Sequence, residues 1–149
     1  MFHIDQTDLI INQTSFVHSK AKDGGVIWTD QGDLVITQYD FAENNASAGG
    51  VMWAEQATVN ANRVDITSNH ANVGVVYLLE STSDWSAISY AGNIGSLYIF
   101  GGEVNIRNSK LMNNTQPSIQ HPLLKEGGNI TAVQCEELPW QLLVDKRPC

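Results

Sequence analysis

The sequence predicts an all-β protein built as a parallel β-helix, or solenoid, of about five coils with roughly 25 residues each. The first observation is a repeat: the stretch 41–53, FAENNASAGGVMW, recurs 25 residues earlier at 16–28 and 25 residues later at 66–78. The second is that each unit holds short β-branched runs between polar turns, with no room for a helix. Stacking such units buries one continuous core.

The amino-acid composition and net charge argue against several classes of function. Only 16% of the 149 residues are charged and the formal net charge is −8, so nucleic acid and anionic membranes would be repelled. No apolar run approaches the roughly 18 residues that a membrane-spanning segment needs. The first residues lack the basic region and cleavage site of a signal peptide. Either the protein is cytosolic, or the chain belongs to a longer secreted protein, which is the reading we favour.

The predicted coils follow one another along the chain. They lie near residues 9–33, 34–58, 59–80, 81–103 and 104–135, and residues 136–149 form a terminal cap or a non-repeat tail. Each coil is predicted to contain three short strands: the first opens at Leu9, Leu34 or Val59, the second ends near Phe16 or its equivalents, and the third follows the glycines. The prolines within 116–123 predict a loop that bulges from the last coil.

Equivalent places in successive coils are expected to stack, so an inward place must be apolar in every coil. The predicted core places are filled by Ile11, Phe16, Ile36, Phe41, Ile66 and Leu111. Glycine pairs are expected where the backbone turns tightly, because glycine adopts positive φ without steric cost. These corners are Gly24, Gly25, Gly49, Gly50, Gly127 and Gly128. Asn44 and Asn69 are expected to form a stacked amide ladder.

The third strand of each coil predicts an aromatic surface. The Ile27 place is aligned with Met52, Tyr77, Tyr98 and Ile130, which are all large, so alternation points this set inward and the Val26 and Trp28 sets outward. Trp28 and Trp53 would then form an exposed ladder that binds sugar faces or a protein partner. Burial of the two tryptophans in the core stays the alternative.

The repeats also resemble a known family. The segments FAEN at 41–44, GGVI at 24–27 and GGVM at 49–52 are similar to the FxxN and GGA-plus-aliphatic motifs of the polymorphic outer membrane proteins of chlamydial surfaces. The resemblance covers residues 9–135, but Val26 and Val51 replace the family's Ala, only Phe41 heads a full FxxN, and no autotransporter barrel is present. It implies a right-handed parallel β-helix and a surface-exposed adhesive or structural module, better suited to a eukaryotic extracellular member.

Two carboxylates, Asp40 and Asp65, are candidates for a chemical site. Ser15, Asp40, Asp65 and Lys110 share one place in the repeat, which puts the Asp40 and Asp65 backbones about 5 Å apart. That spacing fits a retaining glycosidase, or a calcium site with oxygen ligands, or a solvated outer face without chemistry. We expect the last, with no catalytic residue, no cofactor and no metal centre, because the histidines share no ligand spacing.

The remaining motifs concern secretion and partners. Four Asn-X-Ser/Thr sequons, at Asn12, Asn45, Asn113 and Asn129, are glycosylation candidates and favour an extracellular or cell-surface location. Cys135 and Cys149 could pair with each other, with other partners, or stay free.

The function predicted from these features is a non-catalytic scaffold for adhesion or for binding a protein or glycan ligand, continuing into further repeats of a larger chain. The alternatives are a fragment of a carbohydrate-active β-helix enzyme and a purely structural spacer.

Overall fold

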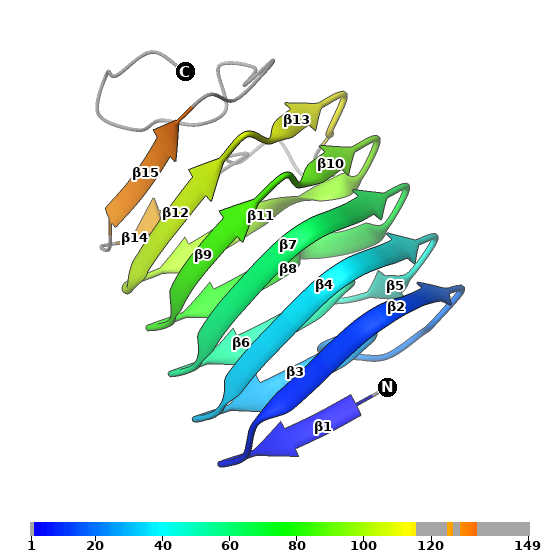
Figure 1. Cartoon of the computed structure of the whole chain (residues 1–149). Helices are drawn as coiled ribbons and strands as arrows, with labels where there is room; N and C mark the ends of the chain where they lie inside the picture. Colours follow the sequence, from blue (N-terminus) through cyan, green and yellow to red (C-terminus); the bar gives the residue numbers. More distant parts are fainter. Residues whose placement is uncertain (1, 116–124, 127–128, 134–149) are drawn as a thin grey trace.

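A computed structural model describes residues 2–115, 125–126 and 129–133, and the described chain is a parallel β-solenoid (Figure 1). It consists of strands joined by turns and contains no helix within those residues. The predicted loop at 116–123, the corner Gly127–Gly128, the tail at 136–149 and both cysteines lie outside the described residues.

Two parallel sheets run along the solenoid, and we name them sheet A and sheet B. Sheet A has the order β1-β3-β6-β8-β11-β14, with β5 paired to β8 beside it. Its strands are β1 (Phe2–Asp5), β3 (Ile27–Asp30), β5 (Asn45–Ala46), β6 (Met52–Glu55), β8 (His70–Leu79), β11 (Ile94–Phe100) and β14 (Lys125–Glu126).

Sheet B is formed by the strands that follow those of sheet A in each turn. In succession along the axis they are β2, β4, β7, then β9 and β10, then β12 and β13, and finally β15 (Figure 1). Their bounds are β2 (Leu9–Val17), β4 (Asp33–Ala42), β7 (Thr58–Thr67), β9 (Thr82–Ser86), β10 (Ser89–Ala91), β12 (Glu103–Arg107), β13 (Lys110–Met112) and β15 (Asn129–Val133).

The strand register confirms the predicted stacking of repeats. Leu9 pairs with Leu34, Leu34 with Val59, Val59 with Ser83, and Ser83 with Val104, so four complete turns lie within residues 9–104. Their lengths are 25, 25, 24 and 21 residues. The fifth predicted coil returns to the same column where Ile130 pairs with Val104, after passing through residues outside the described part.

The first two strands predicted for each coil are one bent strand in β2, β4 and β7. The bend falls at Gln13, Gln38 and Arg63, whose φ angles are 54°, 57° and 54°. A residue in this left-handed conformation turns the chain while backbone pairing continues on both sides of it. In the shorter turns the strand is interrupted at the same place, at Ala87 and Asn108, which also have positive φ.

The interior is a set of apolar columns shared by the two sheets. Of the predicted core residues, Ile11, Ile36, Phe41, Ile66 and Leu111 are buried and Phe16 is half-buried. The rings of Phe16 and Phe41 lie 6.0 Å apart at an interplanar angle of 25°. Because each apolar side chain lies on an equivalent one of the next turn, burial repeats along the axis without a separate core for each coil.

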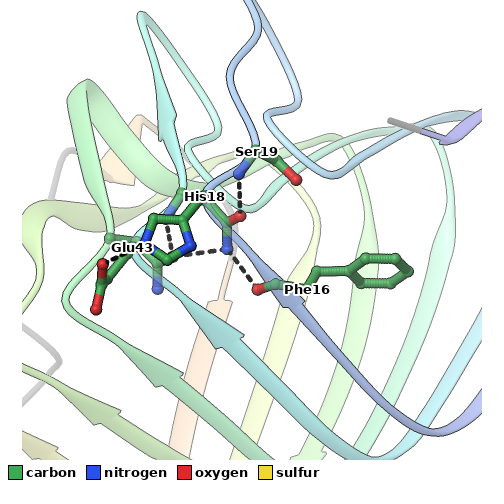
Figure 2. A network of polar contacts seen from close by, with 6 residues as sticks. Phe16, His18, Ser19 and Glu43 are labelled. Carbon is green, nitrogen blue, oxygen red and sulfur yellow. Dashed lines mark hydrogen bonds and ion pairs between the residues drawn. The ribbon is translucent and has the colours of Figure 1, made fainter.

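An asparagine ladder stabilises one corner of every turn (Figure 2). Asn69 Oδ1 accepts the backbone N–H of Asn44 at 2.9 Å, and Asn69 Nδ2 donates to the Phe41 carbonyl at 2.8 Å. Asn44 makes the equivalent bonds to the Ser19 N–H and the Phe16 carbonyl. Asn93 and Asn114 continue the ladder through the next turns. The predicted amide ladder is confirmed, and it satisfies backbone groups that the turn would otherwise leave buried and unpaired.

The two glycines of each pair have different roles. Gly24 and Gly49 adopt φ of +56° and +59°, as predicted for a tight corner. Gly25 and Gly50 do not need positive φ, but a Cβ on Gly25 would lie 2.1 Å from the Gly50 carbonyl oxygen and one on Gly50 would lie 2.7 Å from the His70 oxygen. The second glycine is therefore required by the close approach of neighbouring turns.

Two facing predictions for the third strand were wrong. Val26 is fully buried together with Ile27, because the backbone N–H groups of both donate to the Val51 carbonyl at 3.1 and 3.0 Å and the alternation breaks there. The second error concerns Tyr77. One residue is lost after Ala71, which pairs with Ala46, so Tyr77 pairs with Trp53 and belongs to the outward set.

Ile130 was also placed in the wrong column. It was aligned with Ile27, but it pairs with Val104 in sheet B, whereas Ile27 belongs to sheet A. The segment Lys125–Glu126 occupies sheet A instead, opposite Ile99 and Phe100. Residues 129–131 resemble residues 26–28 in sequence, yet they pair with residues 103–105 in sheet B.

Candidate functional site

The most distinctive surface of the molecule is an aromatic column on the outer face of sheet A. Strand pairing places Trp28 beside Trp53, Trp53 beside Tyr77, and Tyr77 beside Tyr98. His3 precedes Trp28 in the same register. We call these five residues the aromatic ladder. Trp28, Trp53 and Tyr77 are half-buried, so the outward orientation predicted for the two tryptophans agrees with their positions.

The ladder consists of two groups of rings. Trp53 and Tyr77 stack at 4.1 Å with an interplanar angle of 7°, and Tyr77 and Tyr98 stack at 4.4 Å with an angle of 9°. The Trp28 ring contacts the His3 ring at 4.2 Å and a tilt of 45°. Within the described chain, the near-parallel stack therefore ends at Trp53.

This geometry decides which ring surfaces a ligand could reach. Both faces of Tyr77 are covered by neighbouring rings, so Tyr77 presents only its edge and hydroxyl group. Trp53 is covered by Tyr77 on one face, and no described aromatic ring stacks on the face directed toward Trp28. A ligand group that stacks on an aromatic face consequently has its best opportunity at Trp53, between the two groups of rings.

A column of carboxylates runs beside the aromatic ladder. Asp5, Asp30 and Glu55 occupy successive turns and each lies two residues after a member of the ladder, which puts the two columns on the same face of the strands. Leu79 and Phe100 continue this column in β8 and β11. This column therefore changes from acidic in β1, β3 and β6 to apolar in β8 and β11, and Glu126 of β14 pairs with Phe100 at the following position.

A glutamine ladder borders the carboxylate column at the corner of sheet A. The Gln6, Gln31 and Gln56 side chains donate in succession along the axis, with Gln31 Nε2 to Gln56 Oε1 at 3.1 Å and Gln56 Nε2 to Glu80 Oε2 at 3.1 Å. All four residues have positive φ. These bonds hold the corner residues in register, so the neighbouring ladder positions repeat regularly from turn to turn.

Asp40 and Asp65 lie on the outer face of sheet B, in the shared column predicted for them. Asp40 pairs with Asp65, Asp65 with Ser89, and Ser89 with Lys110. Partial burial raises the pKa of the Asp65 carboxyl, the negative charge of Asp40 raises it further, and a hydrogen bond with Ser89 lowers it. A raised pKa is the expected result of partial burial next to a second carboxylate.

Nothing else gathers around this carboxylate pair to form a site. Across the described residues, no group of three or more His, Cys, Asp or Glu side chains is placed to hold a metal ion. The described part also contains no helix long and apolar enough to cross a membrane. Asp40 and Asp65 accordingly remain two neighbouring surface carboxylates rather than the centre of a ligand set.

All four sequon asparagines are exposed. Asn12 and Asn129 belong to strands of sheet B, Asn45 to the short β5, and Asn113 to the turn after β13. None of them lies on the outer face of β1, β3, β6, β8 or β11.

Sequence reasoning found part of this surface and missed the rest. Trp28 and Trp53 were identified, but Tyr77 was assigned to the interior. Tyr98 was assigned there too and is indeed buried, although its ring stacks on Tyr77 in the same column. Asp30 and Glu55 were overlooked, although their positions two residues after Trp28 and Trp53 carried the signal, because alternation puts such residues on one face. The residue lost after Ala71 concealed that the tyrosines extend the same column.

Comparison with known proteins adds no further assignment: no protein-family model, no curated protein and no solved structure matches this chain.

Proposed function

We propose that this protein is a non-catalytic, cell-surface or secreted β-solenoid scaffold that binds a protein or glycan ligand through the aromatic ladder. The observation that carries the proposal is the column of Trp28, Trp53 and Tyr77, which are half-buried on the outer face of sheet A and are continued by the buried Tyr98. Large aromatic side chains that remain on a surface are typical of recognition sites, because they bury much area on binding and lose little conformational entropy.

Two further features support an extracellular binding role. The four sequon asparagines are exposed, and three of them, Asn12, Asn113 and Asn129, lie outside sheet A, as is expected of a glycoprotein whose binding face must stay accessible. The alternation of FxxN-like and GGV motifs resembles the repeats of the polymorphic outer membrane proteins, and this resemblance would make the chain an adhesive module on a right-handed parallel β-helix.

The regular stacking of the solenoid turns is well suited to a binding scaffold. Backbone pairing, the asparagine ladder and the glutamine ladder fix each outward side chain relative to its neighbours on the next turn. A rigid element positions binding groups at little entropic cost, so a column of rings on a solenoid is preorganised for an extended ligand.

Arrays of glycans and of peptides, probed with the labelled protein, test this proposal. The wild-type chain should bind a defined subset of either array, and Trp53→Leu should lose that binding while keeping its circular-dichroism spectrum. A matched control is Ile10→Ser, which changes an exposed apolar side chain on sheet B. Equal binding by wild type and Trp53→Leu would contradict the proposal, and binding to neither array would favour a structural spacer.

A further inference from the structure

The charged side chains on the outer face of sheet A have one sign. The strands β1, β3, β6, β8 and β11 contain neither lysine nor arginine, whereas Asp5, Asp30 and Glu55 form an outward column on the first three of them. The part of the face beside Trp28 and Trp53 is therefore negative.

This column has no neutralising partner in the described chain. The ion pairs there join His18 to Glu43 and Arg107 to Asp84, which are both remote from the outer face of sheet A. Like charges directly opposite each other on neighbouring strands destabilise a sheet. A cation bound along this column would relieve that repulsion.

The aromatic ladder offers a second contact for the same cation. Trp53 has a face on which no described ring stacks, and the backbone of Glu55 lies two residues along the same strand, about 7 Å away. Asp30 occupies the equivalent place on the preceding turn. A planar guanidinium group stacks on an indole face and donates to carboxylates at its edge at the same time, which an ammonium group does less well.

We infer that the outer face of sheet A docks a basic, arginine-containing peptide segment, with a guanidinium group stacked on Trp53 and its N–H groups directed to the carboxylates of Asp30 and Glu55. This inference deepens the proposed function and rests on it. A second copy of the chain is a poor occupant, since the formal net charge of −8 makes two copies repel each other. A neutral glycan would stack on the rings and donate hydroxyl hydrogens to the carboxylates, but it would leave their negative charge without a counter-charge.

The test compares a short oligo-arginine peptide with its neutral oligo-citrulline analogue, using isothermal titration calorimetry at physiological salt. Wild type should bind oligo-arginine more tightly than oligo-citrulline. Asp30→Asn/Glu55→Gln should weaken oligo-arginine binding by about tenfold or more, as should Trp53→Leu. The matched control is Asp40→Asn/Asp65→Asn, which removes the same charge from sheet B and should change the affinity by less than about twofold.

The outcomes separate the inference from the function on which it rests. If the two double variants weaken binding equally, the peptide senses only the net charge and the inference is wrong. If oligo-arginine does not bind but a neutral glycan binds in a Trp53-dependent way, the scaffold function stands and the basic-peptide docking fails. If no probe depends on Trp53, both fail. Urea unfolding midpoints of all variants confirm that each one is folded.

Discussion

Asn69 Oδ1 accepts two hydrogen bonds from Asn44, one from its backbone N–H at 2.9 Å and one from its side-chain Nδ2 at 3.0 Å. The two residues lie on successive turns, and both are about 1% exposed. One amide side chain thus joins two coils and satisfies a buried backbone group that has no strand partner. This relationship repeats along the corner and explains why asparagine recurs there.

Replacing Asn69 by alanine should therefore destabilise the solenoid strongly. The change leaves the Asn44 N–H buried without its acceptor and removes the side-chain donor to the Phe41 carbonyl. Because an unpaired buried group costs about 1–3 kcal/mol and the second lost bond adds about 1 kcal/mol, we expect a loss of about 2–4 kcal/mol in the free energy of unfolding. Urea denaturation measures it. Asn62→Ala, at an exposed position of β7, is the control and should stay within about 0.5 kcal/mol of wild type. Similar losses for both variants would show that the ladder has no special role.

Replacing the second glycine of a pair by alanine should destabilise the protein through a steric clash rather than through an unfavourable backbone conformation. In Gly25→Ala the new Cβ would collide with the Gly50 carbonyl oxygen, so neighbouring turns must separate at a cost of about 3 kcal/mol. In Gly92→Ala the φ of +63° is strained for alanine, but the nearest atom is 3.9 Å away, so the expected cost is only about 1 kcal/mol. Thermal unfolding of both variants checks this order, and a reversed order would contradict the assigned roles.

Phe41 and Phe16 occupy the same column but should differ in their contribution to stability. Phe41 is 1% exposed, so Phe41→Ala should cost about 3–5 kcal/mol through lost burial and the cavity left behind. Phe16 is half-buried, and its truncation should cost clearly less. Chemical unfolding of both variants measures the difference. Equal costs would mean that the first turn is covered more completely than the structure indicates.

Replacing Asp65 by asparagine should stabilise the protein in a pH-dependent way. The pKa of Asp65 is raised by partial burial and by the Asp40 charge, so the native state keeps a proton that the unfolded chain releases at about pH 3.9. The free energy of unfolding of wild type therefore falls as pH rises from the unfolded-state pKa through the higher native pKa. Asp65→Asn removes this loss, so the variant should gain stability relative to wild type above that interval.

Unfolding midpoints at about pH 3 and about pH 7 check the sign of this effect. At the lower pH the advantage of Asp65→Asn should disappear, and at the higher pH it should stay below about 1 kcal/mol. Asp40→Asn should give part of the same gain, since it removes the repulsion but leaves Asp65 partly buried. An advantage that is larger in acid than at neutral pH would contradict the assigned cause.

The sequence predicted the fold because its period lies in the residues that must stack. Phe41 and Ile66 repeat a core place, and Asn44 and Asn69 repeat a corner, since neighbouring turns impose the same requirement at the same place. Such repetition is visible without an alignment. It also identified Trp28 and Trp53 as one outward set.

The remaining errors arose where equal spacing in the sequence does not correspond to equivalent positions in the structure. A constant period of 25 aligned Met52 with Tyr77, but Met52 pairs with Val76, because one residue has been lost between Ala71 and Val76. Alternation also failed at Val26, where a bulged corner buries two consecutive side chains. Neither event changes composition or spacing enough to be recognised from the sequence alone.

The most direct test of the account is a disulfide across the ladder, since the binding surface exists only if Trp53 and Tyr77 are neighbours on successive turns. With Cys135 and Cys149 replaced by serine, Trp53→Cys/Tyr77→Cys should cross-link on mild oxidation, because adjacent strands lie about 4.8 Å apart and disulfides join Cα atoms about 4.4–6.8 Å apart. Trp53→Cys/Leu78→Cys, which tests the constant period of 25, should stay reduced. Cross-linking of the second pair in preference to the first would place Tyr77 in the interior and remove the aromatic ladder.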